Sequence, residues 1–282
     1  MVMQAHLFLS PHFDDAVGAC SGAIQRLRAA GQTVRVITLF TTLAQPLSDF
    51  ARRLHADWGL DDPMPSRLAE NERACGILGC QPETLNFPDA IYRRSKTGVP
   101  LYDTFDALKA EPAADDAGLA ERIAAAIEAR YGKDTSTLYC PLSVGNHVDH
   151  VVTRRSGEIL RARGWNVVFY HDFFYDSFAE PTRFDAADRQ FSTGTLRLTR
   201  NELRMAETAI AAYDSQIAPL FGSAKGLKLY CLKHRRSETY YFPSPEARDA
   251  FLAALPAPGG ARAEQMGFLS SQLDRVFTRL FA

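Results

Sequence analysis

Short apolar runs alternate with stretches of helical periodicity up to about residue 176. The first of them predict a strand at 6–9, a helix of small and apolar residues at 16–30 that ends at Gly31, and a β-branched strand at 34–40. A strand, a helix and a strand in this order form the βαβ unit of a parallel sheet. The pattern therefore predicts an α/β fold with a Rossmann-like, mostly parallel sheet flanked by helices.

Periodicity and turn residues predict the other elements. Helices are expected at 51–58, 66–78, 119–130, 151–162, 200–213 and 272–281, and strands at 84–87, 137–142, 166–170, 190–198, 227–233 and 237–242. Ser66 is the expected N-cap of the second of these helices, after a loop at 60–66. No shift in composition marks a boundary, so residues 1–282 are interpreted as one domain. It has a core at about 5–220 and appended C-terminal strands and a helix at about 221–282.

Composition and charge narrow the class of protein. The formal net charge of -1 gives no electrostatic reason for a nucleic-acid partner. No stretch approaches the ~18 consecutive apolar residues that a membrane helix needs. The chain enters its first strand without a basic and apolar leader, and its five cysteines form no Cys-x-x-Cys pair. We therefore expect a cytoplasmic protein with reduced, mostly buried cysteines and no membrane span, and a homo-oligomer is compatible with the sequence.

One imidazole and two carboxylates follow the first strand within four residues. His12, Asp14 and Asp15 stand where the chain breaks at Ser10-Pro11 and turns into a helix. In an open α/β sheet, ligands bind at the carboxyl ends of the strands. Zinc accepts histidine nitrogen and carboxylate oxygen, so His12 and Asp15 are candidate ligands, with Asp14 free to take a proton from water. The alternative is structural: an aspartate that caps the helix and a histidine held in a loop.

A second cluster follows the strand expected at 137–142. His147 and His150 are three residues apart and share one face of a helix. One of them can bind metal while the other contacts the substrate, and Asp149 can orient a histidine from behind. The alternative is a surface histidine pair beside a basic helix. Two such clusters at two strand ends of one sheet favour a common site.

The two clusters together resemble the LmbE-like, or PIG-L, family of zinc-dependent deacetylases. The family motif His-x-Asp-Asp matches His12, Asp14 and Asp15, and His-x-Asp-His matches His147 to His150. The resemblance implies Zn²⁺ as the cofactor, with His12, Asp15 and His150 as its ligands. It also implies that Asp14 is the general base and that His147 stabilises the oxyanion.

Further matches to the family concern the substrate. An Arg-x-x-Glu motif places Arg67 and Glu70 ahead of a Leu-Gly helix end, and Arg67 is expected to face the substrate. A Phe-Pro-Asp after the next strand makes Asp89 a candidate for binding sugar hydroxyls. Residues 212–216, Ala-Tyr-Asp-Ser-Gln, resemble the late Ser-Gln helix of the family.

Two more stretches carry expectations drawn from their position and composition. Residues 171–177 follow a strand, so Asp172 is a candidate hydrogen-bonding partner for a sugar, although a partly buried aromatic loop is an equal alternative. The basic run of Arg93, Arg94 and Lys96 is interpreted as a solvated face, with contact to an anionic substrate tail as the alternative.

These observations predict a zinc-dependent hydrolase that removes an acetyl group from a small-molecule N-acetylglucosamine derivative. Water activated by zinc attacks the amide carbonyl, with Asp14 as general base. Two alternatives stay open. One is a metal-dependent hydrolase of another bond, such as a phosphoester, because the ligand types alone do not name the bond. The other is a catalytically silent family member that binds a sugar.

Overall fold

The computed structural model describes residues 4–173 and 191–255, and within them a seven-stranded sheet has the order β3-β2-β1-β4-β5-β7-β6. Strands β1 to β5 are parallel, whereas β7 pairs antiparallel with both β5 and β6. The strands are β1 Ala5–Ser10, β2 Thr33–Thr42, β3 Gln81–Pro88, β4 Ser136–Pro141, β5 Asn166–Tyr170, β6 Ser192–Arg197 and β7 Ser237–Phe242.

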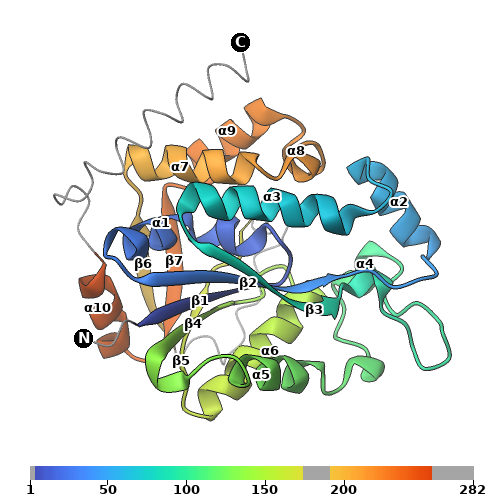
Figure 1. Cartoon of the computed structure of the whole chain (residues 1–282), viewed down its shortest axis with the longest axis horizontal. Coiled ribbons are helices and arrows are strands. Elements are labelled where there is room, and N and C mark those ends of the chain that lie inside the picture. Colours follow the sequence, from blue (N-terminus) through green and yellow to red (C-terminus); the bar gives the residue numbers. More distant parts are fainter. Residues whose placement is uncertain (1–3, 174–190, 256–282) are drawn as a thin grey trace.

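Helices cover both faces of the sheet (Figure 1). One face carries α1 Asp15–Ala29, α3 Pro63–Leu78, α7 Arg200–Ala211, α8 Asp214–Phe221 and α9 Ala224–His234. The other carries α5 Leu119–Glu128 and α6 Val148–Ala162, and α10 Pro245–Ala254 lies beside β6 and β7. Among the described residues, no helix has the length and apolarity to cross a bilayer.

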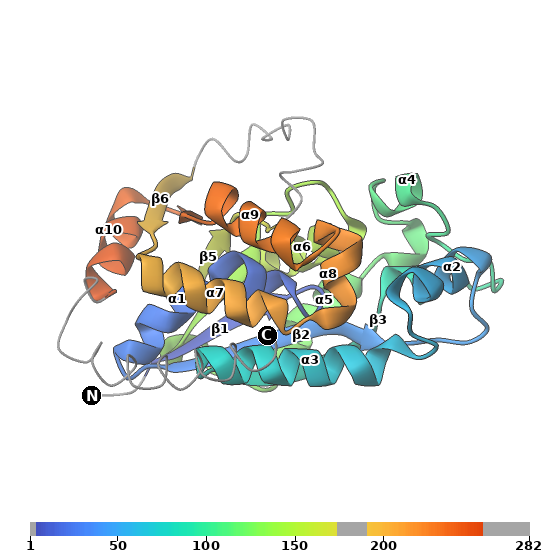
Figure 2. The same ribbon diagram turned by 90° about the horizontal axis from the view of Figure 1, so that it is seen from above.

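A lobe, formed by residues 43–62 and 90–117, extends the structure beyond the carboxyl ends of β2 and β3. It contains α2 Asp49–Trp58, α4 Phe105–Leu108 and the short 3-10 helices Ala90–Tyr92 and Ala114–Asp116. A further 3-10 turn, Lys133–Thr135, precedes β4. Figure 2 shows α2 and α4 together at one end of the molecule. Phe50, Tyr92, Tyr102 and Leu108 build a separate small core in the lobe.

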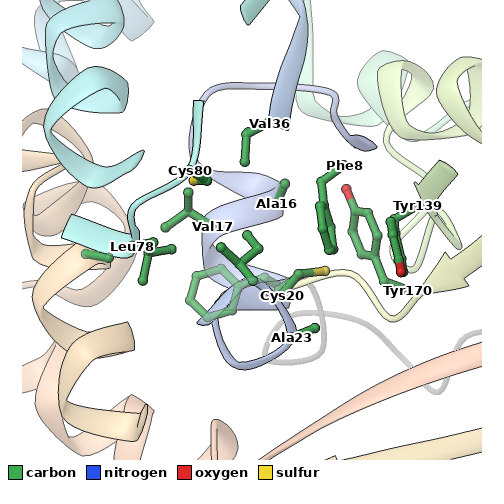
Figure 3. Packing of buried hydrophobic residues seen from close by; sticks show 14 of the residues in the cluster. Phe8, Ala16, Val17, Cys20, Ala23, Val36, Leu78, Cys80, Tyr139 and Tyr170 are labelled. Carbon is green, nitrogen blue, oxygen red and sulfur yellow. The ribbon is translucent and has the colours of Figure 1, made fainter. Parts of the chain in front are cut away.

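The main core lies between the sheet and α1 (Figure 3). Phe8 of β1 stacks on Tyr139 of β4, with ring centroids 4.1 Å apart, because the parallel register pairs the two residues. Gly18 in α1 has no side chain where the Phe173 ring packs: an added Cβ would lie 2.2 Å from the ring. Burial of each large apolar side chain contributes roughly 1.5–3 kcal/mol, so this packing holds β1, β4 and α1 in fixed relation.

The strand order places a topological switch point between β1 and β4. The chain runs from β1 outward to β2 and β3 on one side, and from β4 outward to β5 on the other. Helices that cross over in opposite directions leave a crevice at the carboxyl ends of the two central strands. The segments with His12 and with His147 both emerge there.

The predicted fold class is confirmed, and two local predictions are wrong. Residues 227–233 form part of α9 rather than a strand: the Leu-Lys alternation fits both periods, but Leu227 and Cys231, four apart, are the buried pair. Helix α3 begins at Pro63, inside the expected loop, because Asp62 and not Ser66 is its N-cap and accepts a hydrogen bond from the Met64 amide. The helix expected at 272–281 lies outside the described residues.

Candidate metal centre and active site

The turn after β1 is fixed by its own side chains. Ser10 Oγ donates to the His12 carbonyl (2.5 Å) and accepts from the Ala16 amide (2.9 Å). Asp15 reaches back, and its Oδ2 accepts from the His12 amide (2.7 Å). Asp14 is the N-cap residue of α1 but its side chain makes no capping hydrogen bond. The carboxylate of Asp14 is therefore not used to cap the helix and can form other interactions.

The turn after β4 is built differently. Ser143, Gly145 and Asn146 have positive φ angles, a conformation that glycine and asparagine tolerate best. This tight turn leads into α6, whose N-cap is His147: its Nδ1 accepts a hydrogen bond from the Asp149 amide (3.2 Å). His147, Asp149 and His150 are thereby held on the first turn of α6.

Three side chains from the two turns meet at one point. A nitrogen of His12, a carboxylate oxygen of Asp15 and a nitrogen of His150 all lie within 4.8 Å of one another. His12 Nδ1 and His150 Nε2 are each 3.3 Å from Asp15 Oδ2. Two imidazoles and one carboxylate are the donor types of a catalytic zinc site that keeps a position open for water or substrate. His12 forms a second such group with His147 and Asp149.

The remaining nitrogen of each histidine is held by a buried carboxylate. His12 Nε2 lies 3.1 Å from Asp149 Oδ2, and His150 Nδ1 lies 2.5 Å from Asp172 Oδ1. A histidine that donates its N–H to a carboxylate presents the lone pair of its other nitrogen to a metal. The first group thus has its ligand atoms oriented, whereas in the second group Asp149 is already occupied.

Of the two alternatives that the sequence left open for Asp172, the structure supports the buried one. Its side chain is 0% exposed, and its second oxygen accepts from the Val144 amide (2.9 Å). Both oxygens are engaged inside the protein, so Asp172 orients His150 and does not offer a hydrogen bond to a sugar. Residues 174–177, the rest of the stretch that begins at residue 171, lie outside the described residues.

Charge in this cluster is strongly polarised. Burial disfavours the charged form of Asp15, but His150 and His12 outweigh it and hold the pKa of Asp15 well below its usual range. Burial likewise opposes protonation of His150, yet Asp15 and Asp172 raise its pKa to about 9. The pKa of His12 is also raised, by Asp149, Asp15 and Asp89 against the effect of burial. The protein therefore stabilises positive charge at this point, which a divalent cation supplies.

Asp14 and His147, the N-cap residues of α1 and α6, have the opposite electrostatic properties. Burial raises the pKa of Asp14, which Arg67 only partly offsets through a hydrogen bond from Nη2 to Oδ1 (3.1 Å). Burial and the nearby His12 lower the pKa of His147 well below 6.5, so its imidazole is neutral. Since Nδ1 accepts from a backbone amide, the proton of His147 is on Nε2. The pair comprises a carboxylate of raised basicity and a neutral N–H donor.

The two residues expected to contact substrate lie at this same edge. The Arg67 guanidinium lies between the Phe13 and Trp58 rings, 5.7 and 5.4 Å from their centroids, and contacts Asp14. Asp89 Oδ2 is 3.7 Å from His12 Nε2, while Oδ1 accepts from the Ile91 amide. Burial raises the pKa of Asp89.

The motif residues behind them also meet. Glu70 accepts hydrogen bonds from the amide and the hydroxyl of Ser215, both at 2.8 Å. Tyr213 donates to the Phe13 carbonyl (2.9 Å), next to Asp14. The stretch 212–216 thus braces the turn that carries Asp14.

Arg93 is the residue that the sequence analysis placed wrongly. It was expected on a solvated face, but its side chain is 5% exposed and forms ion pairs with Asp149 and Asp116. Arg94, one residue on, is a surface residue that binds the Gly98 and Pro46 carbonyls. A basic run on a turn-rich segment carries no signal that would separate the two arginines.

Fold and site together define a Rossmann-like α/β protein with a two-histidine, one-carboxylate group that could hold a metal ion at the switch point of its sheet. The sequence pattern of the GlcNAc-PI de-N-acetylase (PIG-L) family matches residues 7–160, more than half of the chain. The chain belongs to this family.

A curated relative and solved structures agree with that assignment. The chain is 30% identical over 246 residues to the 2'-N-acetylparomamine deacetylase of Niallia circulans, covering 80% of this chain and 86% of the relative. The zinc-inhibited form of teicoplanin deacetylase Orf2 superposes with a TM-score of 0.72 at 24% identity, over 84% of this chain and 97% of Orf2. A40926 pseudoaglycone deacetylase Dbv21 gives 0.67 at 24% identity, over 86% and 97% of the two chains. At these identities the two structures show the same fold.

Proposed function

We propose that this chain is a zinc-dependent deacetylase that hydrolyses the acetamido group of an N-acetylated amino sugar to acetate and a free amine. The observation that carries the proposal is the convergence of His12, Asp15 and His150, with Asp14 next to Asp15 in the chain and His147 in a second cluster with His12. Family membership supports the deacetylase class, and the relative that acts on 2'-N-acetylparomamine supports an amino-sugar substrate.

The residues present fit zinc. His12 Nδ1, Asp15 Oδ2 and His150 Nε2 are three ligand atoms of the right kind, and carboxylates fix the second nitrogen of both histidines. When bound there, zinc would polarise a carbonyl and lower the pKa of a water molecule towards ~7. The three residues would hold the zinc ion. Other side chains of the protein would carry out the proton transfer and stabilise the oxyanion.

Asp14 is the proposed general base. It lies next to Asp15 in the chain, is not used as a helix cap, and is oriented by Arg67. Its raised pKa brings its basicity closer to neutral pH, which favours proton transfer from water as water attacks the amide carbon. Arg67 would then act indirectly, by holding Asp14. Its guanidinium would also contact the substrate directly.

His147 is the proposed donor to the oxyanion. A neutral imidazole with its proton on Nε2 can donate a hydrogen bond to the carbonyl oxygen as negative charge develops. Such a preorganised donor contributes about 3 kcal/mol to the transition state. Asp14, protonated by the attacking water, would then deliver that proton to the leaving amine. Asp89, at the same edge, is the proposed partner for sugar hydroxyls.

The experiment is a pair of assays on the zinc-loaded protein. Release of acetate and of primary amine from N-acetylglucosaminides is expected, and release of phosphate from 4-nitrophenyl phosphate is not. The Asp14→Asn variant, loaded with zinc in the same way, is the control for contaminating activity. Phosphate release without amine release would favour the phosphoester reading, and neither activity on a broad panel would favour a silent binding protein.

A further inference from the structure

A buried ion-pair cluster lies directly behind His12. Arg93 Nη1 is 2.6 Å from Asp149 Oδ1, and Arg93 Nε is 3.0 Å from Asp116 Oδ2. The side chains of Arg93, Asp149 and Asp116 are 5%, 0% and 6% exposed. One arginine therefore joins a carboxylate of the metal centre to a carboxylate of the lobe, away from solvent.

Two aromatic rings and a backbone carbonyl also contact Arg93, whose Nη2 is buried without a hydrogen-bond partner among the described residues. Its guanidinium lies 5.3 Å from the Phe40 ring centroid and 5.1 Å from that of Tyr102. Nη1 also donates to the Pro88 carbonyl (3.3 Å). The Tyr102 hydroxyl donates to Asp116 (2.7 Å) and accepts from the Ala113 amide (2.8 Å). These contacts restrict the orientation of the planar guanidinium, so Arg93 can orient a carboxylate that pairs with it.

Asp149 is the group that it orients. With one oxygen on Arg93, the other oxygen is directed to His12 Nε2 (3.1 Å) and to the Ala90 amide (3.1 Å). A buried carboxylate without a counter-charge is strongly unfavourable, so removing the arginine of this buried pair would leave Asp149 uncompensated. Arg93 thus keeps both the charge and the direction of Asp149.

The direction of Asp149 decides which nitrogen of His12 is available. A neutral imidazole carries one hydrogen. When that hydrogen is on Nε2 and donated to Asp149, the lone pair of Nδ1 lies 3.3 Å from Asp15 Oδ2, on the side of the candidate ligands. If Asp149 turns away, the hydrogen on Nε2 loses its acceptor at 3.1 Å and faces only the more distant Asp89 Oδ2 at 3.7 Å, so His12 can place it on Nδ1 instead.

We propose that Arg93 is a positioning residue of the metal centre, which acts through Asp149 to present His12 Nδ1 to the metal. The proposal rests on the metal site proposed above. It assigns a role to the buried end of the lobe, where Arg93 joins Asp116 of the lobe to Asp149 of the metal centre.

The test measures zinc affinity by competition with a chromophoric chelator, on metal-free protein whose folding is checked by thermal unfolding. Arg93→Met is expected to weaken zinc binding by about 10–100-fold, the size of effect found for partners that orient metal ligands. Arg93→Lys, which restores the charge without the fork, is expected to recover part of the loss and serves if the Met variant does not fold. Arg26→Met is the matched control: Arg26 is 10% exposed and paired with Glu202 at 2.8 Å, outside the site. It should leave zinc affinity unchanged.

A double variant separates positioning from general destabilisation. Asp149→Asn alone should weaken zinc binding, and adding Arg93→Met should weaken it little further, because Arg93 acts through the residue already changed. Wild-type affinity in Arg93→Met, or additive losses in the double variant, would overturn the proposal. If the wild-type protein binds no zinc, or His150→Ala binds it as tightly, the metal site itself is wrong, and this outcome differs from a failure confined to Arg93.

Discussion

Two clusters of buried carboxylates in this protein are similar in burial. They differ in whether ligand atoms remain available once the internal hydrogen bonds are made. Under α1, Glu238 accepts from the Gly22 amide (2.6 Å), the Ala23 amide (3.0 Å) and the Tyr240 hydroxyl (2.8 Å), with Arg235 Nη2 at 3.3 Å. In this cluster the donors around Glu238 and the carboxylate satisfy one another.

That cluster explains a local feature of α1. The helix has non-helical dihedral angles at Cys20 (φ -125°, ψ 15°), which frees the amides of the next turn. Glu238 receives them and so caps the second half of an interrupted helix. Arg235 binds the Ala19 carbonyl (2.9 Å) before the interruption. The cluster is structural: β7 contributes Glu238 and Tyr240, and the end of α9 contributes Arg235.

At the switch point the carboxylates orient histidines. Asp149 and Asp172 each hold one nitrogen of a histidine, and the second nitrogens of His12 and His150 meet at Asp15. Buried charge alone therefore does not mark a functional site. Ligand atoms that converge after the supporting hydrogen bonds are made do mark one.

The largest effect is expected where a ligand is removed. His150→Ala removes the one ligand supplied by α6, so acetate release should fall by at least about 10³-fold, since a bound metal contributes several kcal/mol to the transition state. Steady-state assays at saturating zinc measure this. Activity within tenfold of wild type would place the metal elsewhere.

Asp14→Asn sharpens the comparison, because it changes a flanking carboxylate and none of the candidate ligands. The amide keeps the shape and can still meet Arg67, but it cannot take a proton. We expect kcat to fall by about 10²–10⁴-fold, with zinc content unchanged, as measured by acetate release and elemental analysis on the same sample. A kcat close to wild type would remove Asp14 from the role of base.

His147→Ser tests the donor while keeping the helix cap, since serine is a good N-cap residue. The expected loss is about 10²–10³-fold in kcat, the cost of one oxyanion donor, with a smaller change in KM. A loss seen mainly in KM would mean that His147 binds the ground state of the substrate instead.

The pH dependence of metal binding follows from the charge of the cluster. Burial opposes protonation of His150, but Asp15 and Asp172 raise its pKa to about 9 in the absence of metal. A metal ligand must be neutral, so binding has to displace a proton at any pH below about 9. Zinc affinity, measured by chelator competition, should therefore rise as pH increases from 6 to 9. A flat profile over this range would contradict the placement of His150 among the ligands.

Glu238→Gln should have the smallest effect on catalysis. The amide cannot accept from every donor that surrounds Glu238, so the free energy of unfolding is expected to fall by about 1–3 kcal/mol. Denaturant unfolding measures that loss, while kcat of the folded protein should match wild type. A large drop in kcat with unchanged stability would show that the two clusters are coupled.

The structure brings His12, Asp15 and His150 together as the sequence predicts, because the signals for their position are local. His12, Asp14 and Asp15 lie in one turn, as do His147 and His150, and parallel strands bring their carboxyl ends to one edge. Arg93 was placed wrongly, and two alternatives stayed open for Asp172, because the burial of both side chains depends on contacts that span many residues: Arg93 meets Asp149, and Asp172 meets His150. The error at 227–233 has another cause, since a short alternation of lysine and leucine fits a strand and a helix equally.

The measurement that tests the central claim most directly is zinc content per chain, determined by elemental analysis on protein purified without added metal or chelator. The account predicts about one zinc per chain in the wild type and in Asp14→Asn, and none in His150→Ala. Protein without metal that takes up none when zinc is added, or His150→Ala that keeps its zinc, would contradict the three-ligand site and the chemistry proposed from it.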